Sequence, residues 1–159
     1  MARPLPDEDL MWRVTSERDP VHFETSGRRS VEDLTRALSV VGAKLTDFKT
    51  VLDFGCGCGR IMRWLDELPP TVELHGVDVD AQAISWAAKH IPFARFSVNK
   101  ALPPLEFPDG YFDLVFNHSV FSHLPEDYQD AWLAELNRVT SPKGLLLLSV
   151  GGEIGRAHV

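Results

Sequence analysis

Three glycines at alternate positions, directly after a short apolar run, constrain this chain more than any other feature. The segment reads Val51-Leu-Asp-Phe-Gly-Cys-Gly-Cys-Gly-Arg60, and a helical pattern begins at its end. A strand, a glycine loop and a helix start in this order are typical of a nucleotide-type site in an α/β sheet. Glycine suits such a loop because it adopts positive φ and lets the backbone approach a ligand closely.

The spacing within this loop argues against two common nucleotide sites. A dinucleotide fingerprint ends in glycine or alanine five residues after its first glycine, where this chain has Arg60. A phosphate-binding P-loop requires Gly-Lys-Ser/Thr, which does not occur in the sequence. Asp53, two residues before Gly55, would repel a pyrophosphate. It suits a ligand that presents an ammonium or hydroxyl group.

The Asp-x-Gly-x-Gly-x-Gly segment resembles motif I of the class I S-adenosylmethionine-dependent methyltransferases. Three later segments fit the same resemblance in the same order: Val72–Asp78, Phe112–His118 and Leu136–Leu148. The last of them carries Lys143 where the family usually has glycine. The resemblance covers about residues 20–150 and implies that S-adenosylmethionine is the cofactor.

The resemblance also implies which residues bind the cofactor. It places the methionine portion at Asp53 and the glycine loop, the ribose at Asp78, and the adenine near Asn99, where an acid is usual. Gly59 fits close helix–strand packing equally well. The expected cofactor-binding residues are Asp53, Gly55, Cys56, Gly57, Gly59, Asp78, Val79, Asn99, Asn117 and His118.

Methyl transfer from a sulfonium requires alignment and, for a hydroxyl acceptor, removal of a proton. His118 and His123 are the candidate catalytic bases, because histidine titrates near neutral pH. Either could instead form a hydrogen-bonded wall of the pocket. Arg28, in a segment that resembles the family's N-terminal lid, could meet the cofactor carboxylate or remain a solvated surface charge.

Alternating strands and helices predict an α/β fold, a doubly wound Rossmann-like parallel sheet. The resemblance supplies the strand order 3-2-1-4-5. We expect residues 1–20 to form a loose arm and residues 21–159 to form the methyltransferase domain. The expected strands are residues 49–54, 72–77, 93–98, 112–117 and 144–150, and the expected helices are residues 30–41, 59–68, 81–90 and 125–139.

Family members usually add two further strands, 6 and 7, beside the fifth strand. The sequence ends nine residues after the expected fifth strand, so we expect it to lack both of them. The fifth strand would then be an exposed apolar edge. A homodimer could cover this edge, or the chain could be a shortened product or a fragment of a longer protein.

Composition limits the partners and the location of the protein. The net charge of −7, from 23 acidic and 16 basic residues, disfavours binding to nucleic acid or anionic membranes. No apolar run approaches the roughly 18 residues of a membrane span, and the start lacks an apolar signal segment, so we expect a cytoplasmic protein. Cys56 and Cys58 are too close for a usual metal pair or an unstrained disulfide, and we expect no metal.

These observations favour a methyltransferase that acts on a small-molecule acceptor. The alternative is a non-catalytic protein that binds S-adenosylmethionine or serves as a scaffold, because the usual C-terminal strands and acceptor-binding segment are expected to be missing. A nicotinamide dehydrogenase is disfavoured by Asp53 and Arg60.

Overall fold

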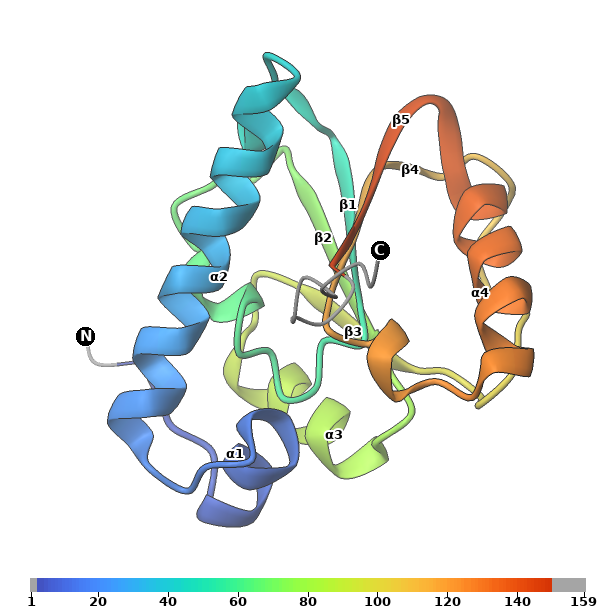
Figure 1. Ribbon diagram of the computed structural model, residues 1–159. Helices are drawn as coiled ribbons and strands as arrows, with labels where there is room; N and C mark the ends of the chain where they lie inside the picture. Colours follow the sequence, from blue (N-terminus) through green and yellow to red (C-terminus); the bar gives the residue numbers. More distant parts are fainter. Residues whose placement is uncertain (1–2, 150–159) are drawn as a thin grey trace, which may run out of the picture.

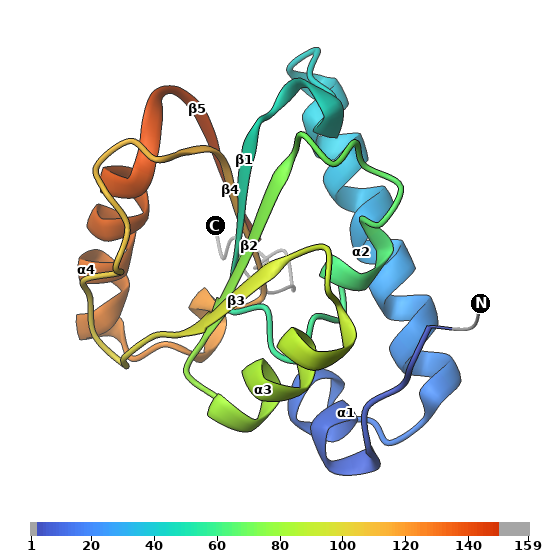
Figure 2. The ribbon, with the colours of Figure 1, turned by 180° about the vertical axis from the view of Figure 1, so that it is seen from behind.

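The computed structural model describes residues 3–149, which form a parallel sheet with helices on both faces (Figures 1 and 2). The strands lie in the order β3-β2-β1-β4-β5, and every neighbouring pair is parallel. This confirms the predicted Rossmann-like sheet and its strand order. The strands are β1 (Thr50–Phe54), β2 (Glu73–Asp78), β3 (Arg95–Val98), β4 (Phe112–His118) and β5 (Thr140–Ser149).

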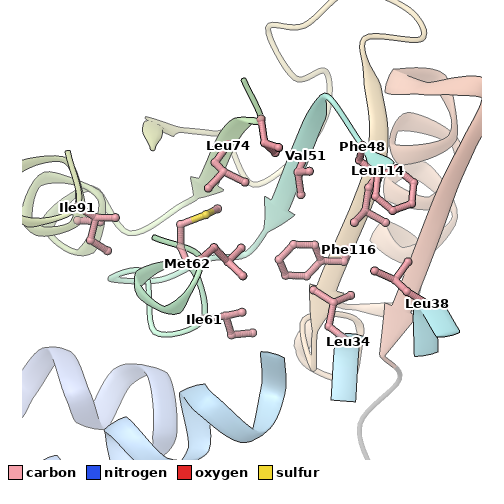
Figure 3. Close-up of a cluster of buried hydrophobic side chains, with 13 residues drawn as sticks. Leu34, Leu38, Phe48, Val51, Ile61, Met62, Leu74, Ile91, Leu114 and Phe116 are labelled. Atoms are coloured by element: carbon pink, nitrogen blue, oxygen red, sulfur yellow. The ribbon is translucent and has the colours of Figure 1, made fainter. Parts of the chain in front are cut away.

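Alternation of side chains along the strands creates one apolar core on each face of the sheet. On one face, Val51 and Leu114 pack with Leu38 of helix α2 (Pro20–Val40) and with residues of the loop after β1 (Figure 3). On the other face, Leu52 and Val115 pack against helix α4 (Glu126–Val139). Asp53 lies between two residues that face α4, so its side chain projects toward α2.

Residues 1–20 were expected to form a loose arm, but the structure has a helix within them. Helix α1 (Glu8–Thr15) begins after Asp7, whose carboxylate accepts a hydrogen bond from the N–H of Leu10. Helix α2 begins at Pro20 rather than at Ser30, because Asp19 caps its N-terminus and proline suits its first turn. Leu10, Met11 and Phe23 form a third buried cluster with Cys58 and Ala83, which orders this segment.

The prediction of a helix at residues 59–68 is also wrong. Helix α3 (Ala81–His90), in contrast, forms where it was predicted, with Asp80 as its N-cap. Residues 59–68 contain only one turn of 3₁₀-helix, Met62–Trp64. Residues 56–63 are all buried, so they do not present the single apolar stripe of an amphipathic helix. β5 begins earlier than expected because Thr140 already pairs with Phe112. Its expected last residue, and the predicted absence of strands 6 and 7, lie outside the described residues.

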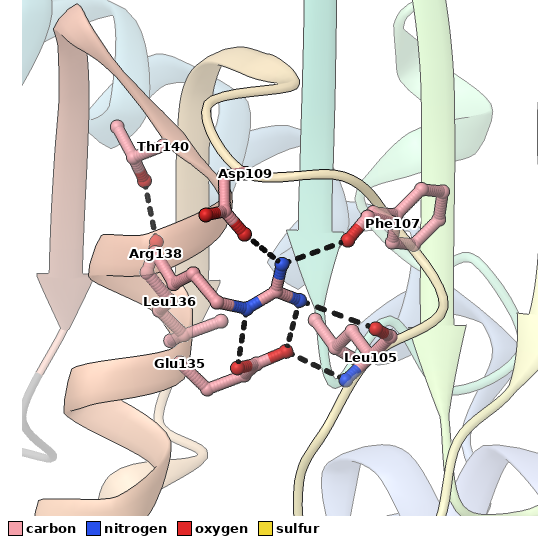
Figure 4. Close-up of polar contacts among 7 residues, drawn as sticks. All are labelled: Leu105, Phe107, Asp109, Glu135, Leu136, Arg138 and Thr140. Atoms are coloured by element: carbon pink, nitrogen blue, oxygen red, sulfur yellow. Dashed lines mark hydrogen bonds and ion pairs between the residues drawn. The ribbon is translucent and has the colours of Figure 1, made fainter.

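A polar network fixes the proline-rich loop after β3 to helix α4 (Figure 4). The Arg138 guanidinium donates to the Glu135 carboxylate at 2.6 and 2.8 Å and to the Asp109 carboxylate at 2.6 Å. Glu135 in turn accepts the N–H of Leu105 at 2.7 Å. The network thus fixes the path of the loop between β3 and β4.

Within residues 3–149, the structure has no helix with the length and apolar character needed to span a membrane.

Candidate functional site

A cavity of about 630 Å³ opens at the carboxyl ends of β1, β2 and β4. Its volume lies in the range of small-molecule and cofactor sites. The glycine loop, the segments after β2, β3 and β4, and residues of α1 and α2 form its wall. The structure brings together most of the residues predicted from the sequence: Asp53, Gly55, Cys56, Gly57, Asp78, Val79, Asn99, His118 and His123.

Two expected cofactor contacts, Gly59 and Asn117, are not among the residues that line this cavity. A Cβ on Gly59 would collide with Ile91, so this glycine serves close packing between the loop and α3. Asn117 is buried on β4, where its Oδ1 accepts the N–H of Ser149 at 2.9 Å. Both residues therefore hold the scaffold rather than form the cavity wall.

The glycine loop is held tightly to the end of β2. The N–H groups of Gly55 and Cys56 both donate to the carbonyl of Val77, at 2.8 and 3.0 Å. Gly55 has φ +78° and Gly57 has φ +55°, and a Cβ on Gly55 would collide with Val120. These positions require glycine because L-residues rarely adopt such φ values and the neighbouring side chain leaves no space.

Two hydrogen bonds from backbone N–H groups fix the carboxylate of Asp78 beside the glycine loop. Its Oδ2 accepts the N–H of Gly57 at 2.8 Å, and its Oδ1 accepts the N–H of Asp80 at 2.9 Å. An ionised carboxylate has about four lone-pair positions, so each oxygen can accept one further hydrogen bond. The side chain thus offers two adjacent acceptors to the cavity, an arrangement that suits a pair of vicinal hydroxyl groups.

Asp53 and Arg60 are two buried ionisable residues in the cavity wall. Asp53 is 2% exposed and its Oδ2 has no hydrogen-bond partner among the described residues. Burial raises the pKa of Asp53 to about 7, with the positive charge of Arg60 opposing the rise and the negative charge of Asp78 adding to it. A buried carboxyl oxygen without a partner is costly, which favours a ligand donor at this point.

Asn99 and His118 complete the polar part of the wall. The Nδ2 of Asn99 donates to the carbonyl of Lys100 at 2.8 Å, and its buried Oδ1 has no partner among the described residues. That oxygen can accept a hydrogen bond from an amino group. Partial burial, together with the Arg60 charge, lowers the pKa of His118, against the opposing effect of Asp33. Its imidazole is therefore neutral at pH 7 and able to accept a proton.

Sequence reasoning missed the part of the wall that comes from the N-terminal helices. Arg13 donates to the Asp80 carboxylate at 3.0 Å, and Val14 lies against Gly57, while His22 and Ser26 line the cavity from α2. The helix caps Asp7 and Asp19 were the available signals for these helices. Arg28, in contrast, is exposed, lies 4.8 Å above the Trp64 ring and is not part of the wall.

The two cysteines of the glycine loop do not form a disulfide. Cys56 and Cys58 are both buried and free, and burial raises the pKa of both thiols. The thiols are therefore protonated and poorly nucleophilic at neutral pH. Residues 3–149 contain no cluster of three or more histidine, cysteine, aspartate or glutamate residues arranged to hold a metal ion.

Comparison with known proteins shows which family has this fold and glycine loop. Residues 51–144 match the family model described as "Methyltransferase domain". The chain is 34% identical over 103 residues to the 2-methyl-6-phytyl-1,4-hydroquinone methyltransferase of Synechocystis, covering 63% of this chain and 31% of that protein. It is 33% identical over 106 residues to the malonyl-[acyl-carrier protein] O-methyltransferase of Halorhodospira halophila, covering 65% of this chain and 35% of that protein. The chain thus spans about a third of the length of these relatives.

Solved structures agree with the sequence comparison. A TehB-like S-adenosylmethionine-dependent methyltransferase from Corynebacterium glutamicum superposes with a TM-score of 0.56 at 25% identity, covering 86% of this chain and 79% of that one. Other solved neighbours contain the demethylated cofactor, S-adenosylhomocysteine. The matched residues include the glycine loop and the two acids Asp53 and Asp78 of the cavity wall.

Proposed function

The chain belongs to the class I S-adenosylmethionine-dependent methyltransferases, and we propose that it transfers the methyl group of this cofactor to a small-molecule acceptor in the cavity. The observation that carries the proposal is the set of unused hydrogen-bond acceptors in the wall. Asp53 and Asn99 each have a buried oxygen without a partner among the described residues, and Asp78 has two lone pairs to spare. S-adenosylmethionine brings donors that match all three.

The groups of the cofactor fit the wall one by one. Asp53 would accept its ammonium group, Asp78 its two ribose hydroxyls, and the Oδ1 of Asn99 the amino group of adenine. Gly55 and Gly57 keep the loop free of Cβ atoms and so let the cofactor approach the backbone. The cofactor and this wall therefore match in both charge and hydrogen-bonding character.

When bound, the cofactor supplies a methyl group activated by its sulfonium. The residues of the chain then orient the acceptor, exclude water and remove a proton where the acceptor is a hydroxyl or an amine. We propose that the imidazole of His118 removes this proton from the acceptor, because the side chain lines the cavity at the end of β4 and is neutral at pH 7. His123 lines the same cavity and is the second candidate.

A small acceptor is supported by charge and by the relatives. The net charge of −7 disfavours a nucleic acid as the acceptor. The Synechocystis relative is named for a hydroquinone acceptor. Part of the wall, including His22, Ser26 and Tyr128, is not needed for the cofactor groups assigned above and remains for the acceptor.

The reaction can be tested with a panel of acceptors of different chemistry. The purified chain is incubated with S-adenosylmethionine and small phenols, hydroxy acids, carboxylic acids and amines, and release of S-adenosylhomocysteine is measured. Release that depends on an acceptor and is lost in His118→Ala supports the proposal. Cofactor binding without turnover on any acceptor class would instead favour a non-catalytic cofactor-binding protein.

Replacing Asp78 with alanine should weaken binding of S-adenosylhomocysteine by roughly 5- to 150-fold, about 1–3 kcal/mol, because ribose donors lose their partner. Isothermal titration calorimetry of both proteins measures the change. Asp66→Ala is the matched control, since Asp66 pairs with Arg3 at the surface and does not line the cavity. Equal affinities of the wild type and Asp78→Ala would contradict the assignment.

Cofactor affinity should also depend on pH through Asp53. Because its pKa is raised to about 7, Asp53 holds its proton below this pH and becomes a carboxylate above it. Affinity for an ammonium ligand should therefore rise about five- to tenfold from pH 6 to pH 7.5, before the ligand's α-amino group begins to lose its own proton near pH 8. Titrations at several pH values should show this rise in the wild type and a flat profile in Asp53→Asn.

A further inference from the structure

Among the described residues, two arginines line the cavity, and each lies near a different acid. Arg13 is partly exposed at the end of β2, where it pairs with Asp80 at 3.0 Å. Arg60 is 7% exposed and follows the glycine loop beside Asp53, close enough for its charge to oppose the rise in the Asp53 pKa. Arg60 is therefore the arginine next to the carboxylate proposed to accept the ammonium group.

The Arg60 guanidinium makes a hydrogen bond to helix α2, but not all of its N–H donors have a partner. Its Nη1 donates to the hydroxyl of Ser30 at 3.1 Å, and that hydroxyl donates to the carbonyl of Ser26 at 3.0 Å. Its Nε is buried and has no hydrogen-bond partner among the described residues. Gly27 makes this arrangement possible, because a Cβ there would collide with the backbone carbonyl of Arg60. Helix α2 thus holds a cation whose hydrogen-bonding capacity is incompletely used.

The chemistry of the cofactor indicates what this cation meets. The ammonium and carboxylate groups of an α-amino acid sit on the same carbon atom. A wall that receives the ammonium at Asp53 must therefore accommodate the carboxylate close by. A guanidinium is suited to this task because it can donate two parallel hydrogen bonds to one carboxylate.

We propose that Arg60, rather than Arg28, binds the amino-acid carboxylate of S-adenosylmethionine, and that it makes the site selective for cofactor forms that retain this carboxylate. The inference rests on the proposed function and adds a residue to the same site. Arg28 does not serve because it is exposed, stacks on Trp64 and does not line the cavity. Ser30 acts as a positioning residue, since it holds Arg60 without being part of the cavity wall.

A pair of matched ligands separates this role from a structural one. S-adenosylhomocysteine and its decarboxylated analogue, S-adenosyl-3-thiopropylamine, share the nucleoside, the thioether and the amino group. The wild type should bind S-adenosylhomocysteine more tightly than the analogue. Arg60→Met should weaken binding of S-adenosylhomocysteine by roughly 10- to 100-fold and binding of the analogue by less than about threefold. If Arg60 only neutralises Asp53, both ligands lose affinity equally, and the proposal is overturned.

Two controls complete the calorimetric experiment. Arg60→Lys keeps the charge but not the paired donors, and should recover part of the lost affinity for S-adenosylhomocysteine. Arg13→Met removes the other lining arginine and should not discriminate between the two ligands. Selective loss in Arg13→Met but not in Arg60→Met would overturn the assignment.

Ser30→Ala provides a test that keeps Arg60 in place, should Arg60→Met fail to fold. It should weaken binding of S-adenosylhomocysteine by about two- to fivefold and leave the analogue unchanged. Equal effects on both ligands would overturn the proposal. Failure of the folded wild type to bind either ligand would overturn the proposed function itself, whereas equal wild-type affinity for both would overturn only the role of Arg60.

Discussion

Replacing His118 with alanine should lower kcat for methyl transfer to a hydroxyl acceptor by roughly 100- to 10,000-fold, the range that a positioned general base contributes. His118 lines the cavity at the carboxyl end of β4, and its lowered pKa keeps the imidazole neutral at pH 7. The affinity for S-adenosylhomocysteine should change by less than about threefold, because the loss falls on the chemical step. Steady-state kinetics and calorimetry on the same variant separate the two effects.

The pH profile gives this prediction a second readout. In the wild type, kcat should rise with pH through a pKa below the ordinary histidine value and then reach a plateau, because the base acts in its neutral form. His118→Ala should lose this dependence. His123→Ala is the matched control, since His123 lines the same cavity and should reduce kcat by less than about tenfold. The reverse pattern would make His123 the base.

Replacing Trp132 with alanine should lower the free energy of unfolding by about 3–5 kcal/mol, the typical cost of removing a fully buried large aromatic side chain. Trp132 is 1% exposed and its ring lies 4.7 Å from that of Phe54, at the end of β1. Its Nε1 donates to the carbonyl of Ala101 at 3.0 Å, so the loop after β3 also loses an anchor. Urea unfolding measures the loss.

The neighbouring residue on α4 is the control for Trp132. Leu133 is 44% exposed, so Leu133→Ala should change the free energy of unfolding by no more than about 0.5 kcal/mol. A loss below about 1 kcal/mol for Trp132→Ala would show that this residue does not support the cavity wall as described.

The elements predicted well from the sequence are those whose signals are local. Asp80 and the apolar spacing after it define α3, and short, almost continuously buried apolar runs define β1 and β4. The backbone conformation of the glycine loop can also be predicted from its sequence, because positive φ at three alternating positions requires glycine. The part of the cavity wall that the glycine loop and the strand ends form could therefore be predicted from the sequence.

The elements that were missed depend on contacts distant in the sequence. Helix α1 is ordered because Leu10 and Met11 pack against Cys58 and Ala83, which no short window of the sequence reveals. Residues 60–63, directly after the loop, are all buried, so their periodicity does not indicate their shape. In the sequence, Arg60 stands out only as a departure from a dinucleotide fingerprint. Its proximity to Asp53 and Ser30 exists only in the folded chain.

All of these roles depend on one property, which is that the cavity at the carboxyl ends of the strands binds S-adenosylmethionine through Asp53, Asp78 and their neighbours. Isothermal titration of the purified wild-type chain with S-adenosylhomocysteine tests it most directly. The predicted result is saturable binding of about one ligand per chain with a Kd in the micromolar range, about −8 kcal/mol, and proton release near pH 7 as Asp53 ionises. A folded protein that shows no binding at millimolar ligand would contradict it.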